Sequence, residues 1–290
     1  MDTFIQLTVA GLSNGAILAL AALGFVLIYK ASGVINFAQG QFLLIGAYVV
    51  WALTVDAGLH WALAVAGAIG VAIVLGLLVE RVILRPLVGE PTISVIMVTI
   101  GLAQVLGALV QIIWGTEPRA FPEFIPDDVV TVAGARMGEN RLWALGLVVL
   151  ALVVFAVFFQ RSRYGIAMRA VADDQQAALT MGISVRRTFA LAWALAGVSA
   201  VVGGILIANL IGVSGEVSNI GLLVFPVVIV GGLDSVPGAV VGGAIIGLLT
   251  AYTGGYLGGG LDAVIPYVAL VAILLVKPYG LFGEVRIERV

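Results

Sequence analysis

The stretch GVINFAQGQFLLIGAY, residues 33–48, decides how this chain folds, because it interrupts an otherwise apolar region. Asn36, Gln39 and Gln41 fall within six positions, with Gly40 between the two glutamines. A continuous helix in hydrocarbon would carry apolar side chains there, since polar groups without hydrogen-bond partners are costly in lipid. The stretch therefore predicts a broken helix whose backbone is buried in protein or lines a cavity.

The composition places the whole chain in a membrane. Hydrophobic residues make up 62% of the chain and charged residues 10%, and the mean hydropathy is +1.19. Soluble domains average about 25% charged residues, so this chain has too little polar surface to cover a globule. Cysteine is absent, which excludes disulfides and thiol chemistry. We expect no cleavable signal peptide, because no basic segment precedes the first apolar stretch.

The apolar segments predict an all-α, polytopic helical membrane protein with about eight to ten transmembrane or half-membrane helices. No domain boundary interrupts residues 1–290, so we expect a single transmembrane domain. A second break is expected at GGLDSVPG, residues 231–238. The full-length candidates are Phe4–Tyr29, Trp61–Val79, Thr92–Trp114, Leu142–Phe159 and Thr188–Ile211, and the shorter ones are Phe42–Leu53, Ile220–Val230, Ala239–Tyr252 and Ala263–Val276.

The charge distribution predicts the orientation, because cytoplasmic loops are enriched in Lys and Arg. Segment 161–187 carries five arginines, and segment 115–141 carries an acidic excess with three prolines. We expect the first segment inside, the second outside, and, over nine crossings, the N-terminus outside and the C-terminus inside. The other basic residues expected inside are Arg81, Arg85, Lys277, Arg286 and Arg289, and the acidic residues expected outside are Glu117, Glu123, Asp127, Asp128 and Glu139.

The sequence lacks the elements of nucleotide hydrolysis and of most catalysis. A phosphate-binding loop needs a lysine after a glycine-rich turn, and neither Lys30 nor Lys277 follows that pattern. His60 is the single histidine, which leaves no Ser-His-Asp arrangement. Asp234 is the main ionisable residue within the later apolar segments, and we interpret it as a turn or cap residue in preference to a proton-coupling group.

The segment RYGIAMRAVADDQQAALTMGISVRRTFAL, residues 163–191, is the most distinctive polar stretch. Asp173 or Asp174 is placed to cap a short helix, which we expect within residues 171–183, and Gly182 is placed to end it. The apolar face of this helix has two interpretations. It lies on lipid headgroups, or it docks a partner protein.

Four motifs resemble one family. QAALTMG resembles the coupling motif of ABC importer permeases, Glu-Ala-Ala-three residues-Gly, with Gln176 at the Glu position, Ala177 and Ala178 following, and Gly182 last. Other stretches resemble the branched-chain amino acid permeases, the LivH type. They are GIAMRAVA and MGI around the coupling motif, VINFAQGQ, VIVGGLDSVPGAVVGGAIIGLL and LLVKPYGLFG. This resemblance extends from about Gly11 to Gly283.

The resemblance implies the pore subunit of an ATP-driven importer in the cell membrane of a prokaryote. It implies a second permease subunit (a related chain or a second copy), two cytoplasmic ATPase subunits that bind ATP and Mg²⁺, and an extracytoplasmic solute-binding protein. This chain would bind no cofactor itself. The ATPase coupling segment would then consist of Asp173, Asp174, Gln176, Ala177, Ala178 and Gly182.

The chain departs from the family pattern at three positions. Gln39 replaces a frequent His, Gln41 a frequent Glu, and Gln176 the Glu of the coupling motif. The substrate alternatives are therefore urea, short amides and small organic acids. A secondary transporter or facilitator is a less favoured function class, and a membrane scaffold is third.

Two sets of residues are expected on the translocation pathway. The first set is Asn36, Gln39 and Gln41, whose amides donate and accept hydrogen bonds. The alternative for these amides is that they link neighbouring helices. The second set is Gly231, Gly232, Asp234 and Ser235, which we expect deep in the membrane. The alternative for the second set is a cytoplasmic turn between two spans.

Overall fold

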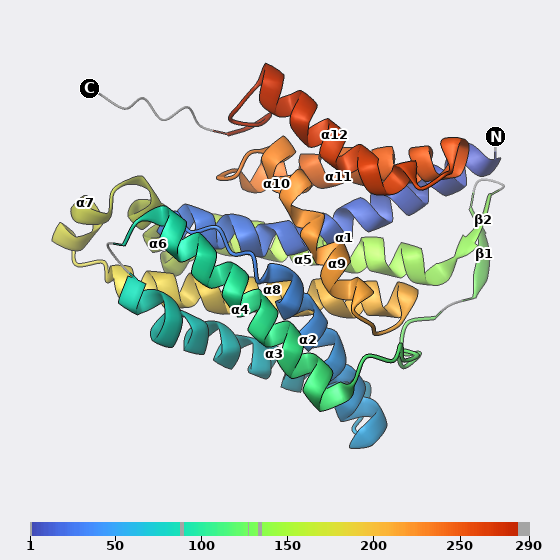
Figure 1. Cartoon of the computed structure of the whole chain (residues 1–290), viewed down its shortest axis with the longest axis horizontal. Helices are drawn as coiled ribbons and strands as arrows, with labels where there is room; N and C mark the ends of the chain where they lie inside the picture. The colour runs from blue at the N-terminus through green and yellow to red at the C-terminus, as the bar shows by residue number, and fades with distance from the viewer. Residues whose placement is uncertain (1, 88–89, 127, 133–134, 284–290) are drawn as a thin grey trace.

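The computed structural model describes residues 2–87, 90–126, 128–132 and 135–283, and it has the form of an elongated bundle of helices (Figure 1). Six of its helices are long and apolar enough to cross a membrane. The predicted all-α membrane fold is thereby confirmed. The six candidate spans are Asp2–Ser32, Trp61–Leu87, Thr92–Trp114, Glu139–Arg161, Val185–Ile211 and Val236–Leu257.

The bounds of the elements follow the predicted spans closely. Between α4 (Thr92–Trp114) and α5 (Glu139–Arg161) the structure adds a short antiparallel hairpin that the sequence did not indicate, with Val129 paired to Gly138. The predicted span Ile220–Val230 is divided into two helices at Leu223. The helices are α1 (Asp2–Ser32), α2 (Gln39–Trp51), α3 (Trp61–Leu78), α4 (Thr92–Trp114), α5 (Glu139–Arg161), α6 (Arg163–Asp173), α7 (Gln175–Thr180), α8 (Val185–Ile211), α9 (Glu216–Leu222), α10 (Val224–Gly231), α11 (Val236–Tyr252) and α12 (Leu261–Val276), and the strands are β1 (Val129–Val132) and β2 (Ala135–Gly138).

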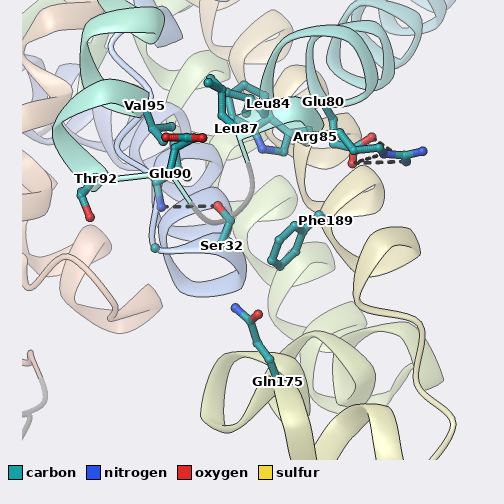
Figure 2. A pocket seen from close by; sticks show the side chains of 13 residues that line it. Ser32, Glu80, Leu84, Arg85, Leu87, Glu90, Thr92, Val95, Gln175 and Phe189 are labelled. Atoms are coloured by element: carbon teal, nitrogen blue, oxygen red, sulfur yellow. Dashed lines mark hydrogen bonds and ion pairs between the residues drawn. The ribbon is translucent and has the colours of Figure 1, made fainter.

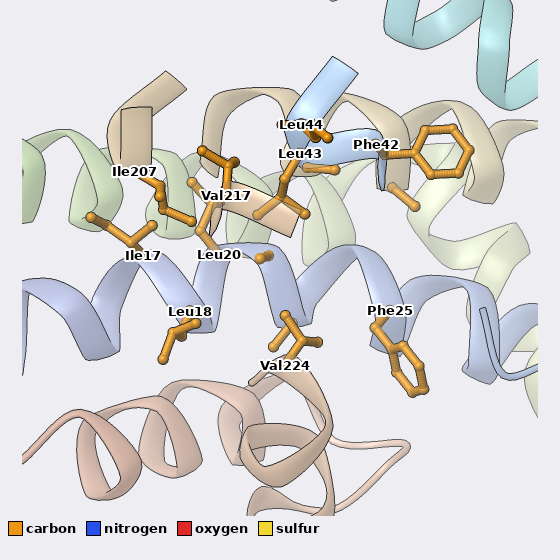
Figure 3. Close-up of a cluster of buried hydrophobic side chains, with 14 of the residues drawn as sticks. Ile17, Leu18, Leu20, Phe25, Phe42, Leu43, Leu44, Ile207, Val217 and Val224 are labelled. Atoms are coloured by element: carbon orange, nitrogen blue, oxygen red, sulfur yellow. The ribbon is translucent and has the colours of Figure 1, made fainter. Parts of the chain in front are cut away.

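Helix α1 is the central element of the bundle. It packs mainly against α11 and α8, and nearly all of its residues from Ile17 to Ile28 are buried. Figure 3 shows Ile17, Leu20 and Phe25 of α1 among buried side chains of neighbouring helices. The C-terminal half of this apolar helix is therefore enclosed by protein.

Glycines bring α1 and α11 into backbone contact. A Cβ atom added to Gly15 would lie 2.3 Å from the Gly243 carbonyl oxygen, and one added to Gly247 would lie 2.2 Å from the Gly11 carbonyl oxygen. Lipid removes the hydrophobic drive for helix association, so close packing of small residues has a larger share in holding membrane helices together. These glycines are accordingly requirements of the fold.

The basic and acidic segments lie at opposite ends of the bundle. Helices α6 and α7 lie at one end, and β1 and β2 at the other (Figure 1). The basic segments meet at the α6–α7 end: Arg85 and Gln175 line one cavity, and Lys30, Arg169 and Phe282 line another. This separation is the one that the charge distribution predicted. Of the residues used in that prediction, Asp127, Arg286 and Arg289 lie outside the described residues.

The loop that follows α4 is tied to the opposite end of the bundle. Arg119 and Val213 exchange two backbone hydrogen bonds of 2.9 and 2.8 Å. The Arg119 guanidinium lies 4.2 Å from the centre of the Trp51 ring, and Trp51 Nε1 donates to the Ala120 carbonyl oxygen at 3.1 Å. These contacts join α2, the loop and the α8–α9 connection, and they give the described part of the loop an ordered structure.

We predict that Gly15→Ala destabilises the protein, because the added methyl group collides with the α11 backbone. Overpacking of this kind costs about 1–3 kcal/mol. Gly146→Ala in α5 is the matched control, since a Cβ there has open space around it. Thermal unfolding of the purified chain measures both variants. Equal stability of the two variants would contradict backbone contact between α1 and α11.

Candidate functional site

The predicted break at residues 33–38 separates α1 from α2, and its amides are engaged inside the bundle. Asn36 and Gln39 are each 1% exposed. Asn36 Oδ1 accepts from the Ala38 backbone N–H at 3.0 Å, and Asn36 Nδ2 donates to Gln39 Oε1 at 3.2 Å. Gln39 Nε2 in turn donates to the Ala21 carbonyl oxygen of α1 at 3.2 Å. The two amides therefore connect the break to the middle of α1.

Thr99 of α4 completes the hydrogen bonding of the break, and the sequence analysis missed it. Its single hydroxyl proton lies within hydrogen-bond distance of the Ile35 carbonyl oxygen at 3.0 Å and of the Ile96 carbonyl oxygen of its own helix at 2.9 Å. The hydroxyl oxygen accepts from the Phe37 N–H at 3.4 Å. The side chain is fully buried. A hydroxyl within an apolar span was the available signal, because polar groups inside membranes are placed where they find partners.

The three amides of the break consequently differ in what they can do. Asn36 and Gln39 are buried and bonded within the chain, which favours the helix-linking interpretation over contact with a passing solute. Gln41 is partly exposed, and its buried Oε1 has no hydrogen-bond partner among the described residues. It lies beside Gly107 of α4. Gln41 is the amide of this set with hydrogen-bonding capacity left over.

The GGLDSVPG segment forms a tight turn between α10 and α11. Gly232 has φ +116°, and Ser235 Oγ accepts from the Gly238 N–H at 3.0 Å at the start of α11. The closing motif pairs with the turn: the Leu281 and Phe282 N–H groups donate to the carbonyl oxygens of Val230 and Gly231, each at 2.9 Å. Two motifs that lie far apart in the sequence thus build one structure.

The surroundings of this turn bear on its depth. Asp234 and Ser235 line a cavity of about 620 Å³ together with Lys30 and Arg169, and Arg169 belongs to α6 at the basic end of the bundle. The placement favours a turn at the basic end of the bundle over a break deep in the membrane. Charged groups from three elements meet there, and such groups avoid the hydrocarbon region.

The coupling segment contains a short helix at the extreme end of the bundle (Figure 1). Asp174 Oδ1 accepts from the Gln176 and Ala177 N–H groups at 2.8 and 3.0 Å, so Asp174 is the cap and Asp173 ends α6. Gly182 has φ +79°, as its predicted role in ending the helix requires. The expectation of one helix within 171–183 was too long, because the extended backbone of Asp174 separates α6 from α7.

The exposed surface of α7 is apolar at its tip. Leu179 is 57% exposed and Met181 81% exposed, whereas Ala178 is buried. Ala178 anchors the segment through its carbonyl oxygen, which accepts from the Ile183 N–H at 2.9 Å. Helix α7 with its C-cap Met181, called the α7 knob below, therefore presents two large exposed apolar side chains.

A cavity of about 200 Å³ is lined both by the start of α7 and by the break after α1. Figure 2 shows Gln175 of α7 and Ser32 of α1 facing the same space as Glu80 and Arg85. Glu80 is 3% exposed and forms an ion pair with Arg85 at 3.1 Å. Gly33, the first residue after α1, also lines the cavity. The start of α7 and the start of the break thus line one cavity.

The chain belongs to the family described as branched-chain amino acid transport system / permease component, which matches residues 7–274. The class of the protein is thus a membrane permease component.

Individual relatives cover almost the whole chain. The high-affinity branched-chain amino acid permease LivH of Escherichia coli K12 is 30% identical over 99% of this chain and 98% of its own length. BraD of Pseudomonas aeruginosa is 31% identical with the same shares. The probable LivH of Methanocaldococcus jannaschii is 30% identical over 92% of this chain and 89% of its own. These names support the branched-chain interpretation and give no support to the urea, amide and organic-acid alternatives.

A solved structure shares the fold. The similar chain is described as PsaBC from Streptococcus pneumoniae in complex with Fab, with a TM-score of 0.51 over 96% of this chain and 94% of that chain. The sequences are 12% identical, so the likeness is one of fold alone.

We predict that Gln39→Ala and Gln41→Ala have different effects. Loss of Gln39 removes a side-chain bond to the Ala21 carbonyl and leaves the buried Asn36 Nδ2 without its partner, and an unsatisfied buried group costs about 1–3 kcal/mol. Gln39→Ala should therefore lower the unfolding temperature, with normal transport per folded molecule. Gln41→Ala should leave the unfolding temperature within about a degree and lower transport per folded molecule. The reverse pattern would show that Gln39 contacts the solute.

Proposed function

We propose that this chain, as one domain of residues 1–290, is a permease subunit of an ATP-driven importer of branched-chain amino acids in a prokaryotic cell membrane. The observation that carries the proposal is the family membership over residues 7–274. The absence of a phosphate-binding motif in the sequence supports the assignment of ATP hydrolysis to partner subunits, which would bind ATP and Mg²⁺. The other proposed partners are a second permease subunit and an external solute-binding protein.

The α7 knob is the proposed contact with an ATPase subunit. Its two large apolar side chains, Leu179 and Met181, stand on a short helix fixed by the Asp174 cap and the left-handed Gly182. Gln176, Ala177 and Ala178 carry the coupling motif within this helix. Apolar side chains on a rigid helical element suit insertion into a groove, whereas a mobile headgroup surface would not require such fixed geometry.

The proposed route of coupling runs from α7 through the adjoining cavity. Gln175 lines that cavity together with Gly33, Glu80 and Arg85. A shift of α7 would change the packing at the end of α1, and the hydrogen bonds of Asn36, Gln39 and Thr99 would carry the shift into α1, α2 and α4. Gln41 on α2 is the proposed solute contact, and Gly231, Gly232, Asp234 and Ser235 are proposed to position α10 and α11 at the basic end.

Uptake by the purified, assembled transporter tests the proposed function. Proteoliposomes that hold both permease subunits, the ATPases and the binding protein should accumulate leucine, isoleucine or valine when ATP is present, without any ion gradient. Uptake that needs a proton or sodium gradient and no ATP would instead establish a secondary transporter. The absence of any uptake would support a scaffold.

We predict that Gly182→Val uncouples ATP hydrolysis from uptake or releases the ATPase, because valine strains the left-handed backbone that ends α7. Uptake should fall at least about tenfold, since the knob geometry would be lost. Gly258→Val is the matched control: Gly258 has φ +63° and open space, as Gly182 does, but it follows α11 at the other end of the bundle. Normal uptake and assembly in Gly182→Val would contradict the coupling role.

We predict that the hairpin end faces outside. The chain has no cysteine, so single cysteines report on orientation directly. Asp128→Cys beside β1 should react with an impermeant thiol reagent on intact cells, and Arg163→Cys on α6, an exposed position outside the proposed ATPase contact, should react only after the membrane is opened. Labelling in the opposite order would reverse the proposed orientation.

A further inference from the structure

An apolar cavity of about 230 Å³ lies between α1, α5, α8, α9 and α11, apart from the coupling segment and the break. Its wall includes Ile17, Leu18 and Ile207 (labelled in Figure 3), all of which are buried. The polar groups on the wall are Arg141, Asn14 and Thr250. Drug-sized ligand pockets have roughly 300–1,000 Å³, so this cavity suits a smaller molecule with an apolar body.

Arg141 is the unusual member of this wall. It lies in the first turns of α5, and its guanidinium Nη1 is buried with no hydrogen-bond partner among the described residues. Its backbone carbonyl accepts from Ser13 Oγ at 3.0 Å, which fixes this turn of α5 against α1. Arg141 as a whole is partly exposed, but a buried nitrogen with an unused donor is costly, and an anion in the cavity would take up that donor. The site therefore has a place for an anion.

We propose that this cavity is a substrate subsite, in which Arg141 receives the carboxylate and the apolar wall receives the side chain of an aliphatic amino acid. The inference deepens the proposed function and rests on it. An arginine fork binds a carboxylate through two parallel hydrogen bonds. Asn14 offers an amide oxygen to the α-ammonium group, and Asn14 is exposed, which places it where a ligand reaches the cavity. The wall supplies no carboxylate for the ammonium, so the carboxylate dominates recognition and binding stays weak enough for release.

A phospholipid offers similar chemistry, because it also combines an anion with an apolar body. The amino acid is favoured by size: the cavity is smaller than drug-sized pockets, whereas an acyl chain needs an elongated groove. Competition with leucinamide separates the two, since leucinamide keeps the leucine side chain and lacks the carboxylate.

The test measures binding of labelled leucine to the permease–ATPase complex in nanodiscs without the binding protein. Arg141→Gln should raise the leucine Kd at least tenfold, and Arg141→Lys should restore part of the affinity by returning the charge. Arg136→Gln is the matched control, because Arg136 is an exposed arginine on β2 near the same end of the bundle. It should change the Kd less than twofold. Leucinamide should compete at least tenfold more weakly than leucine for the wild-type complex.

The outcomes separate this inference from the proposed function. The subsite is overturned if leucinamide competes as well as leucine, if Arg141→Gln binds like Arg136→Gln, or if leucine fails to displace a phospholipid held by Arg141. It is also overturned if the complete transporter imports leucine while the wild-type complex alone binds none. Failure of the complete transporter to import any branched-chain amino acid would overturn the function as well. If Arg141→Gln does not assemble, the leucinamide competition decides.

Discussion

The hydrogen bonds that enclose the break after α1 are the constraint on which the arrangement of helices depends. A broken helix exposes backbone groups that lipid cannot satisfy, so the protein must supply partners. Asn36 and Gln39 supply them from within the segment, and Thr99 supplies them from α4. Because these bonds end on α1, α2 and α4, the break fixes the relative positions of three helices while it interrupts one.

Close backbone approach gives the same bundle its second organising feature. Gly15 and Gly243 let α1 and α11 touch, and Gly231 and Gly238 do the same for α10 and α11. The closing motif then bonds to the end of α10. Motifs that are far apart in the sequence therefore form one packed unit, with α1 at its centre and the coupling knob at its end.

The sequence was sufficient for the spans, the separation of basic and acidic ends, a cap at Asp173 or Asp174 and the left-handed Gly182, because each depends on local residue chemistry. It was not sufficient for features that depend on tertiary contact. The bonding of Thr99 to the break and the burial of Arg141 Nη1 depend on segments that are far apart in the sequence. The β1–β2 hairpin is local, but the sequence analysis did not predict it. The charged groups beside GGLDSVPG could not be predicted from the sequence either, because hydropathy shows where a helix breaks but not which residues lie near the break. The length of α7 was overestimated because the end of α6 and the short α7 were taken as one helix, which the extended backbone of Asp174 divides.

Hydrogen–deuterium exchange over residues 34–42 of the assembled transporter tests most directly that the break is a fixed, enclosed brace. The Phe37 N–H donates to Thr99 Oγ1 and the Ala38 N–H to Asn36 Oδ1, so both amides should exchange slowly in the resting state and in the ATP-bound state. Thr99→Val should speed the exchange of Phe37 and leave the exchange in α8 unchanged. Exchange in the wild-type transporter as fast as that of an exposed loop would contradict the account.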